Sequence, residues 1–237
     1  MPTDIAFSTP VYSVAVAGVG RHANAVTCLV KARRGSLTVM GQEQSVTGEV
    51  VIIRPGVDHR IVCGEDGFTS MFLTGVRWSR PDPLAERIEG RLVELAEAGM
   101  RLASDSQHEL RARLAHGQDS PPPSMRSVLT ELAAEPMARM TQGELAHRLR
   151  LERTQALRLF KASTGMTFRR FKRWTGLQHA ARLIVGGALV RTAALDSGFA
   201  DTAHLTRTFK QDFGLTPSQA LAGLPTIGGF SPPTPRA

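Results

Sequence analysis

Residues 156–168 read ALRLFKASTGMTF and residues 205–217 read LTRTFKQDFGLTP. Aligned without gaps, the two stretches share five identities in thirteen positions at a constant offset of 49 residues. The identities are Arg158 with Arg207, Phe160 with Phe209, Lys161 with Lys210, Gly165 with Gly214 and Thr167 with Thr216. Such self-similarity indicates one structural unit that the chain uses twice.

Each copy is predicted to contain most of the second helix of a helix-turn-helix unit. A short helix with Leu145–Ala146 precedes the first copy, and one with Ala193–Ala194 precedes the second. Gly198–Phe199 supplies a turn and an apolar residue to fill it, and Asp201 can cap the helix that follows. The apolar residues expected to face inward are Leu159, Phe160, Leu205 and Phe209.

The opposite faces of these two helices carry groups that can read base edges in a DNA major groove. Arginine can donate two hydrogen bonds to guanine, glutamine can pair with adenine, and threonine or alanine methyl groups can contact the thymine methyl. The base-reading candidates are Thr154, Gln155, Arg158, Thr202, Ala203, Thr206 and Arg207. A solvated helix face is the alternative for any one of them, and it is weakest for the two arginines that match across the repeat.

A single helix is predicted between the copies, over residues 168–185. Its roughly 18 residues would span about 27 Å, so it could hold two reading helices near one DNA turn apart, about 34 Å. Arg169, Arg170, Lys172 and Arg173 crowd its beginning beside Trp174. They would grip phosphates if this face meets the duplex and would otherwise form a solvated face. The phosphate-contact candidates are Arg153, Lys161, Arg169, Arg170, Arg173 and Lys210.

The charge distribution separates the chain into two parts. The 237 residues carry a formal net charge of +8, and residues 125–225 hold 15 Lys and Arg against 7 Asp and Glu, which accounts for all of it. A compact basic unit attached to a neutral one is the electrostatic footprint of a nucleic-acid binder, with a merely basic surface as the alternative. Helices in the basic part are expected to start at Ser124, Thr141, Glu152, Thr167, Val190, Asp201 and Thr216.

The N-terminal part is predicted to be a small β-barrel or sandwich. Short β-branched runs separated by glycine-containing turns cover residues 11–19, 26–30, 36–40, 49–53, 61–63 and 69–73. From Leu84 to Leu102, and again over residues 109–115, the apolar spacing favours amphipathic helices that either pack on the barrel or pair with a second chain. Pairing is slightly preferred, which makes this segment a candidate for dimerisation.

The predicted fold class is therefore α+β with two domains, joined by a stiff spacer that contains Pro121–Pro123. The proposed divisions are a barrel over 1–80, a helical segment over 81–116, a linker over 117–124, a tandem helix-turn-helix domain over 125–225, and a disordered tail over 226–237.

The C-terminal motifs resemble those of the AraC family of transcription regulators. The resemblance covers about residues 125–225 and rests on Leu157–Lys161 with Gly165, on Ala194–Phe199 with Asp201 and His204, and on Arg207–Pro217. It implies a sequence-specific activator, and it makes His204 a structural contact instead of a base reader. Two departures are Gly176, where the family usually has arginine before the leucine of its central helix, and the absence of an aromatic–arginine pair after Pro217–Ser218.

The resemblance also implies a cupin-like N-terminal barrel that binds a small effector or supports dimerisation. Gly35–Val39, Val50–Arg54 and Pro55–His59 are similar to the strand and turn sequences of such barrels. A metal-binding cupin enzyme with a basic appendage is the second hypothesis. It would need several clustered histidines and a carboxylate, whereas this part offers only His22 and His59, far apart in sequence. We therefore expect no enzyme, no metal and no cofactor, and the effector-binding residues stay unassigned.

An architectural or RNA-binding protein is a third hypothesis, although the chain lacks the glycine and aromatic motifs of single-strand readers. Cys28 and Cys63 show neither metal-ligand spacing nor a disulfide framework, which suits a reducing cytosol. No secretory signal or membrane-spanning stretch is expected. The expected partners are double-stranded DNA, a small-molecule effector, a second copy of the chain and RNA polymerase, in the cytoplasm.

Overall fold

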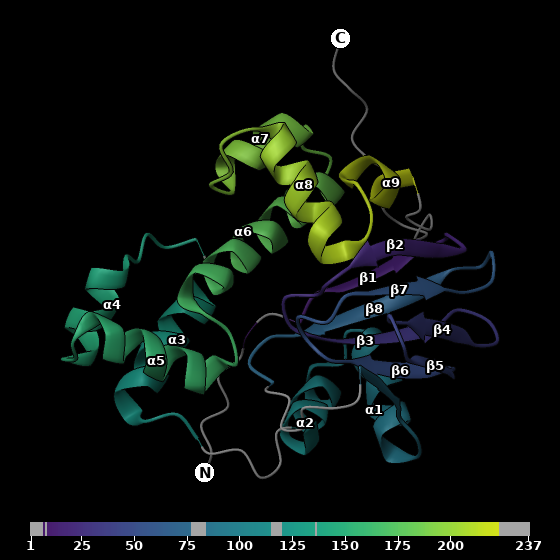
Figure 1. The fold of residues 1–237 in the computed structure, drawn as a ribbon, viewed down its shortest axis with the longest axis horizontal. Helices are drawn as coiled ribbons and strands as arrows, with labels where there is room; N and C mark the ends of the chain where they lie inside the picture. Colours follow the sequence, from purple (N-terminus) through teal and green to yellow (C-terminus); the bar gives the residue numbers. More distant parts are fainter. Residues whose placement is uncertain (1–6, 8, 77–83, 115–119, 136, 223–237) are drawn as a thin grey trace.

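The computed structural model describes residues 7, 9–76, 84–114, 120–135 and 137–222. It has the predicted α+β organisation, with antiparallel strands in the N-terminal part and helices from residue 123 onward (Figure 1). The predicted tail, residues 226–237, and residues 117–119 of the spacer lie outside the described residues. No helix in the described ranges is both long and apolar enough to cross a membrane.

The N-terminal part consists of two antiparallel sheets. One has five strands in the order β1-β8-β3-β6-β9, and the other has four in the order β2-β7-β4-β5. The strands are β1 (Val11–Val14), β2 (Gly18–His22), β3 (Thr27–Ala32), β4 (Leu37–Met40), β5 (Ser45–Gly48), β6 (Val50–Ile53), β7 (His59–Val62), β8 (Phe68–Leu73) and β9 (Ala85–Arg87). The β2 strand is an edge of its sheet.

The register of β3 and β6 decides which residues line the interior between the sheets. Cys28 pairs with Ile53 and both belong to the inner core, whereas Leu29 pairs with Ile52 and both belong to a second core on the outer face. The five-stranded sheet is therefore apolar on both faces, as expected for a sheet covered on both sides. Sequence alone could not assign this interior, because a shift of one residue exchanges the two faces.

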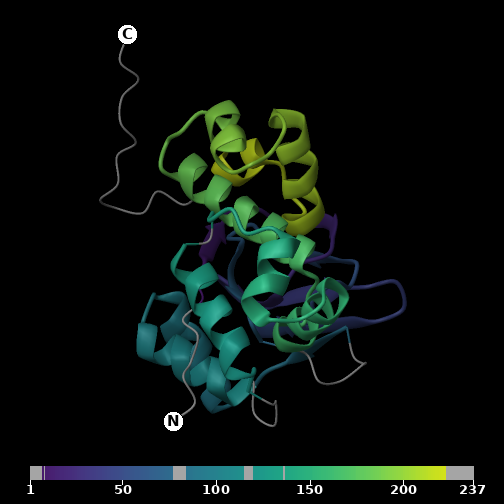
Figure 2. The same ribbon diagram turned by 90° about the vertical axis from the view of Figure 1, so that its left-hand side faces the viewer.

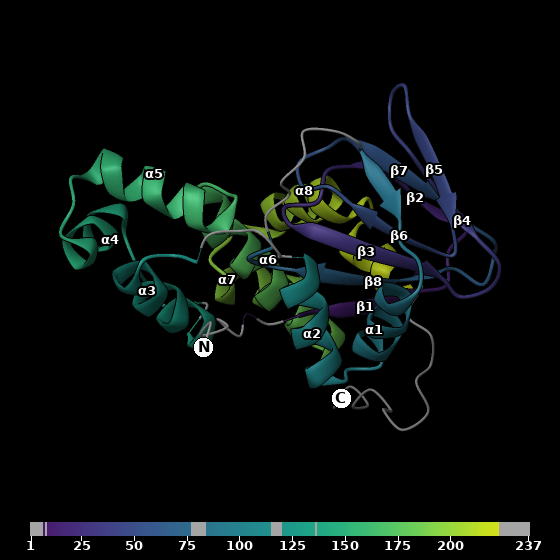
Figure 3. The same cartoon turned by 90° about the horizontal axis from the view of Figure 1, so that it is seen from below.

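Two helices, α1 (Arg91–Met100) and α2 (Ser104–Leu114), cover the outer face of the five-stranded sheet (Figure 3). Leu95 and Ala96 of α1 and Leu110 of α2 are buried there against Leu29 and Met71. Of the two roles open to this segment, the structure shows packing on the β-sheet.

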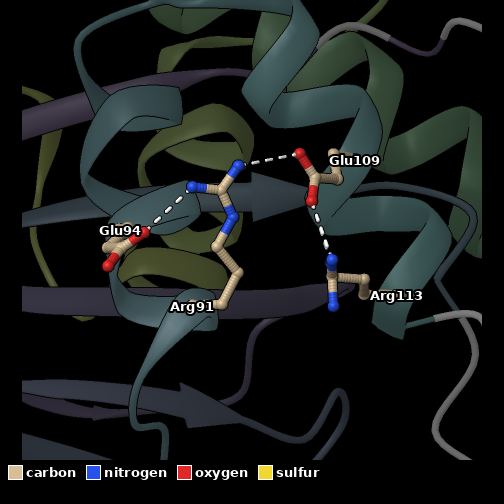
Figure 4. A network of polar contacts seen from close by, with 4 residues as sticks. All are labelled: Arg91, Glu94, Glu109 and Arg113. Atoms are coloured by element: carbon tan, nitrogen blue, oxygen red, sulfur yellow. Dashed lines mark hydrogen bonds and ion pairs between the residues drawn. The ribbon is translucent and has the colours of Figure 1, made fainter.

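The solvent side of α1 and α2 is charged. Arg91 donates to Glu94 at 2.9 Å and to Glu109 at 3.2 Å, and Glu109 also accepts from Arg113 at 3.0 Å (Figure 4). Hydrogen bonds from Arg91 and Arg113 lower the pKa of the Glu109 carboxyl. Since these groups are exposed, solvent and salt screen their attraction, and the network mainly fixes how the two helices lie side by side.

Three sequence expectations for the N-terminal part were wrong. Residues 11–19 form two strands in different sheets, because the chain crosses between sheets before Gly18. The β5 strand was missed. Residues 85–87, expected to be helical, form β9, which pairs with β6, while Leu84 and Ile88 are buried. The spacing of Leu84 and Ile88 fits a helix, but pairing with β6 overrides this local pattern.

The C-terminal helices begin within two residues of their predicted starts. They are α3 (Pro123–Ala134), α4 (Gln142–Leu149), α5 (Arg153–Thr164), α6 (Phe168–Val185), α7 (Val190–Asp196), α8 (Thr202–Phe213) and α9 (Pro217–Ala222). Pro123 begins α3, so the last residues assigned to the spacer belong to a helix. Proline is tolerated there because the first helical turn needs no N–H partner.

The sequence repeat is a structural repeat. Both α5 and α8 have 12 residues and begin 49 residues apart. Each ends at a glycine in the left-handed conformation, Gly165 with φ 77° and Gly214 with φ 72°. The hydroxyl oxygens of Thr167 and Thr216 then accept hydrogen bonds from N–H groups three residues on and cap the next helices. The shared residues thus set the ends of both helices.

Candidate nucleic-acid interface

Each helix-turn-helix unit pairs a short helix with a 12-residue helix. In the first unit Thr141 and Glu144 form a capping box at the start of α4, with Glu144 N to Thr141 Oγ1 at 3.1 Å. The turn after α4 passes through Arg150, which has φ 54°, and the turn after α7 passes through Gly198, with φ 79°. In the second unit the Asp201 carboxylate accepts from His204 N at 2.6 Å and caps α8.

The α5 helix presents a polar outer face. Ala156 and Phe160 are fully buried, and Thr154, Gln155 and Arg158 are all exposed. Because these three positions fall within about 100° of one another around a helix of 3.6 residues per turn, they form one surface. Leu159, expected to face inward, is half-buried.

The α8 helix repeats this arrangement. Leu205 and Phe209 are buried. The base-reading candidates on α8 are Thr202, Ala203 and Arg207, which are exposed, and Thr206, which is half-buried. His204 packs its ring against Phe199 with centroids 5.2 Å apart and accepts a hydrogen bond from Ala200 N, the structural contact that was expected.

A cleft of about 870 Å³ runs along one face of α6 next to the turn of the second unit. Its basic lining residues are Arg139, Arg169, Arg170, Lys172 and Arg173. The cleft lies between the two units, which stand at opposite ends of α6 (Figures 1 and 2).

The phosphate-contact candidates differ in how free they are to meet DNA. Lys161, Arg169 and Lys210 are exposed. Arg153, also exposed, donates from Nε and Nη2 to Gln142 Oε1 at 3.0 and 2.5 Å, so it ties α5 to α4. Arg173 forms an ion pair at 3.7 Å with the buried carboxylate of Asp212 on α8.

Arg170 is half-buried and reaches the N-terminal part of the chain. Its Nη2 donates to the carbonyl oxygen of Asn24 at 3.0 Å, and burial lowers the pKa of its guanidinium. In this arrangement Arg170 lines the cleft and also contacts the β-sheet part through Asn24.

Gly176, one of the two departures from the AraC pattern, has a packing reason. A Cβ at this position would lie 2.8 Å from the carbonyl oxygen of Ser197, in the turn of the second unit. The glycine therefore lets that turn approach α6 closely, and α6 continues without interruption over 18 residues. Glycine within a helix costs about 1 kcal/mol of stability, but this close contact requires a residue without a Cβ atom.

The edge strand β2 docks on the end of α8. Gly20 N donates to Gly214 O at 3.2 Å, and Ala23 N donates to Gln211 O at 2.9 Å. The Asn24 side chain adds a hydrogen bond from Nδ2 to Asp212 O at 2.7 Å. These three bonds, which we call the β2–α8 contact, join the sensor-like part directly to a candidate reading helix.

Trp174 forms a second connection between the two parts. Its side chain is 1% exposed and its ring centroid lies 5.3 Å from that of Phe72 on β8 and 5.7 Å from that of Phe213 on α8. Its Nε1 donates to Thr74 Oγ1 at 3.1 Å. The core is therefore continuous from the β-sheets into the helices.

An apolar cavity of about 60 Å³ lies at this junction. The β-part contributes Val14, Val30 and Phe72 among others, α6 contributes Ala181 and Ile184, and the end of α8 contributes Phe209 and Phe213. Sequence reasoning did not find this site, since its lining comes from segments about 200 residues apart along the chain. No local pattern marks such a site.

The structure also brings His22 and His59 together, although they are distant in sequence. They are paired residues of β2 and β7, with ring centroids 4.3 Å apart. Burial and the neighbouring His59 lower the pKa of His22 to about 4, and burial lowers that of His59. Within the described ranges, no third histidine, cysteine or carboxylate joins them to make a group that could hold a metal ion.

A family model described as a helix-turn-helix domain matches residues 145–223, which include α5 to α9 and most of α4. These residues are an AraC-type helix-turn-helix domain. The chain is a DNA-binding transcription regulator. No curated protein sequence matches the chain significantly.

The AraC-type domain and the β-part together have the fold of ToxT from Vibrio cholerae. An apo variant of ToxT superimposes with a TM-score of 0.58 at 14% identity, covering 95% of this chain and 100% of ToxT. ToxT with an unsaturated fatty acid bound gives 0.56 at 13% identity, over 93% and 96% of the two chains. ToxT bound to (E)-4-(8-methylnaphthalen-1-yl)but-3-enoic acid gives 0.55 at 12%, over 91% and 98%. The likeness shows that the two-part fold is shared.

The exposed arginines of the AraC-type domain give a direct test of base reading. If these arginines read bases, Arg158→Ala and Arg207→Ala should each cost about 1–3 kcal/mol of binding at one half-site, the cost of a lost bidentate contact to guanine. Binding would be measured by competition on duplexes in which one half-site at a time is changed. Arg60→Ala, which removes an exposed arginine from β7, is the control. An equal loss on every sequence would assign the arginine to phosphate.

Proposed function

We propose that this transcription regulator reads two half-sites of a promoter with α5 and α8 and activates transcription, and that a small apolar molecule in the cavity weakens DNA binding by stabilising the described arrangement. The single observation that carries the proposal is the composition of that cavity, which is built partly from the β-sheets and partly from α6 and α8. A ligand there touches sensor and reader at once. Its binding energy can therefore shift the equilibrium between two arrangements of the AraC-type domain.

The base-reading and phosphate-contact assignments belong to this proposal. The outer faces of α5 and α8 would enter successive major grooves, while Lys161, Arg169 and Lys210 would contact phosphates without reading sequence. Arg170 can join them only after it leaves the Asn24 carbonyl. The arrangement described here is thus proposed to be the state with weaker DNA binding.

An apolar effector is supported by the lining and by the ToxT comparison. ToxT has been solved with an unsaturated fatty acid and with an aromatic carboxylic acid, both largely apolar ligands. Mostly apolar pockets with a few polar groups are the usual form of small-molecule sites. We propose that the cavity of this chain plays the same part, with no catalytic role.

A reversible disulfide across the β2–α8 contact tests the coupling. The double variant Ala23→Cys with Gln211→Cys places thiols at two residues whose backbones already share a hydrogen bond of 2.9 Å. Oxidation would hold β2 on α8, and we expect the oxidised protein to bind DNA about 5- to 150-fold more weakly than the reduced protein, the usual range of coupling between sites. Reduction should restore binding in the same sample.

Sequences selected from random duplex DNA by the full-length protein would supply the target for these measurements. The single variants Ala23→Cys and Gln211→Cys control for Cys28 and Cys63, neither of which is paired. Equal DNA affinity of the oxidised and reduced double variant would contradict the coupling, because the contact would then be irrelevant to DNA binding.

The remaining parts of the proposal concern assembly. A homodimer would place four reading helices on one promoter, and RNA polymerase would be the partner in activation. If α1 and α2 pair with a second copy, their described surface offers the charged network of Arg91, Glu94, Glu109 and Arg113. The domain divisions at 80, 116, 124 and 225 and the cytoplasmic location are likewise proposed.

A further inference from the structure

Two residues that line the cavity, Asn24 and Tyr12, each carry a buried polar atom with no hydrogen-bond partner among the described residues. Asn24 is 1% exposed, and its Nδ2 donates to Asp212 O, which fixes the orientation of the amide. Its Oδ1 is buried and has no hydrogen-bond partner among the described residues. Since a buried acceptor without a donor costs about 1–3 kcal/mol, this oxygen favours any ligand group that can donate to it.

The hydroxyl of Tyr12 is a second buried atom without a partner in the described part of the chain. Tyr12 lines the same cavity, and its ring lies 6.0 Å from that of Phe213, the residue that follows the Asp212 bound by Asn24. Burial raises the pKa of the Tyr12 phenol to about 12, so the hydroxyl keeps its proton at neutral pH. It can therefore donate to a ligand oxygen.

The electrostatic environment disfavours an anion. Among the described residues that line the cavity, none is lysine or arginine. The lining histidine, His22, has its pKa lowered to about 4 and is neutral near pH 7. Arg182 acts on Tyr12 electrostatically but is exposed and does not line the cavity. A carboxylate placed there would lose its hydration without a cationic partner, which is costly.

We propose that the cavity binds a compact, neutral, apolar molecule that carries a hydroxyl or comparable hydrogen-bond donor, and that it discriminates against carboxylates. The ligand's hydroxyl donates to Asn24 Oδ1 and accepts from the Tyr12 hydroxyl, and its hydrocarbon part packs against Val14, Phe72 and Phe213. This inference rests on the proposed effector function of the cavity and names the ligand class. It also sets the chain apart from ToxT, whose bound ligands are acids.

The size of the cavity limits the ligand to a small one. A buried water needs about 10–15 Å³ of such volume, so the cavity of about 60 Å³ holds about five water-sized groups before it widens toward solvent. A six-membered ring with one substituent has at least seven non-hydrogen atoms, so it would fill this volume and reach into the end that opens toward solvent. Long flexible chains would have to extend out of the cavity.

Three probes of one ring size separate the chemical possibilities. Cyclohexanol can donate and accept, cyclohexanone can only accept, and cyclohexanecarboxylate is an anion near pH 7. Titration calorimetry with the full chain is expected to show that cyclohexanol binds about 3- to 10-fold more tightly than the ketone, as expected for one satisfied buried hydrogen bond. The carboxylate should bind most weakly. Fluorescence of Trp174, which packs on Phe72 and Phe213, is a second readout.

The variant Tyr12→Phe tests whether the ligand binds in the cavity. Because the hydroxyl has no partner in the described structure, its removal should leave the fold intact while cyclohexanol affinity falls about 3- to 10-fold. Thr47→Val removes a hydroxyl from β5, outside the cavity lining, and should leave the affinity unchanged. A carboxylate that binds most tightly, equal affinity for alcohol and ketone, no heat with any probe, or an alcohol affinity unaffected by Tyr12→Phe would each overturn the inference.

DNA binding with saturating cyclohexanol separates this inference from the proposed function. If the alcohol is preferred and Tyr12→Phe weakens it, yet DNA affinity does not respond, the ligand class stands and effector control fails. If DNA affinity responds instead to the carboxylate, effector control stands and the ligand class fails.

Discussion

Replacing Trp174 with alanine is expected to lower the free energy of unfolding by about 3–5 kcal/mol, the usual cost of removing a large aromatic side chain from a core. Trp174 is 1% exposed and joins α6 to both β8 and α8 through Phe72 and Phe213. Urea unfolding followed by circular dichroism would give the free energy. The substitution should mainly weaken the packing between the β-part and the helices. The two parts are therefore expected to unfold in separate transitions.

Trp174→Phe is the matched variant for this experiment. It keeps a ring for Phe72 and Phe213 and removes the Nε1 donor to Thr74 Oγ1, so an intermediate loss is expected. In both variants the helical core, including Phe171, and the ring of Phe7 that packs on it remain in place. A loss below about 1 kcal/mol in Trp174→Ala, the median for ordinary substitutions, would show that the junction contributes little to stability.

Acidification is expected to destabilise the folded chain through His22. An unfolded histidine gains its proton near its ordinary pKa of 6.5, whereas burial and His59 hold the pKa of His22 at about 4 in the folded chain. Between these values the unfolded chain binds more protons, so the free energy of unfolding falls as pH is lowered from 6.5 to 4. The decrease should reach about 3 kcal/mol, since one pKa unit corresponds to about 1.4 kcal/mol.

His22→Gln tests the assignment of this pH dependence. The variant removes the titrating group, so its stability at pH 7 and at pH 4.5 should differ less than in the unsubstituted chain. His147→Gln, at an exposed position on α4, should retain the full pH dependence. Chemical unfolding at both pH values gives the comparison, and identical pH profiles for His22→Gln and the unsubstituted chain would rule out this origin.

Local sequence patterns predicted the helical half of the fold well. The identities between residues 156–168 and 205–217 set both helix lengths, and the caps at Asp201, Thr167 and Thr216 mark starts that the structure confirms. These features depend on neighbours within one helical turn. Exposure of Arg158 and Arg207 also follows from helical periodicity, so the outer faces of the reading helices could be predicted.

Features that depend on distant pairing could not be predicted. The β9 strand exists only because β6 lies beside it, and the adjacency of His22 and His59 comes from strand register. Asn24 offers no motif, yet its carbonyl oxygen holds Arg170 and its side chain holds α8. The cavity needs both parts in place. DNA binding was therefore predictable from local repeats, while the proposed regulation rests on contacts between segments far apart in the chain, which no local pattern marks.

Arg111 is another residue that sequence reasoning overlooked. It is 8% exposed, and its guanidinium donates to the carbonyl oxygens of Thr74 and Phe7 and, at 2.6 Å, to Thr9 Oγ1. One side chain on α2 thus ties the segment before β1 to the residue after β8, and these two strands are neighbours at one edge of the five-stranded sheet. An arginine in an amphipathic helix is usually solvated, and nothing local distinguishes this one.

The position of β2 at a sheet edge has a consequence for solubility. An uncovered edge strand presents unpaired backbone groups that can template pairing with other chains and lead to aggregation. Here the end of α8 covers part of that edge by accepting from Gly20 N and Ala23 N. A fragment that ends before α8 would leave the edge bare and tend to self-associate. We therefore expect α8 to protect this edge from misassembly as well, so a state in which α8 has left β2 should be short-lived unless DNA captures it.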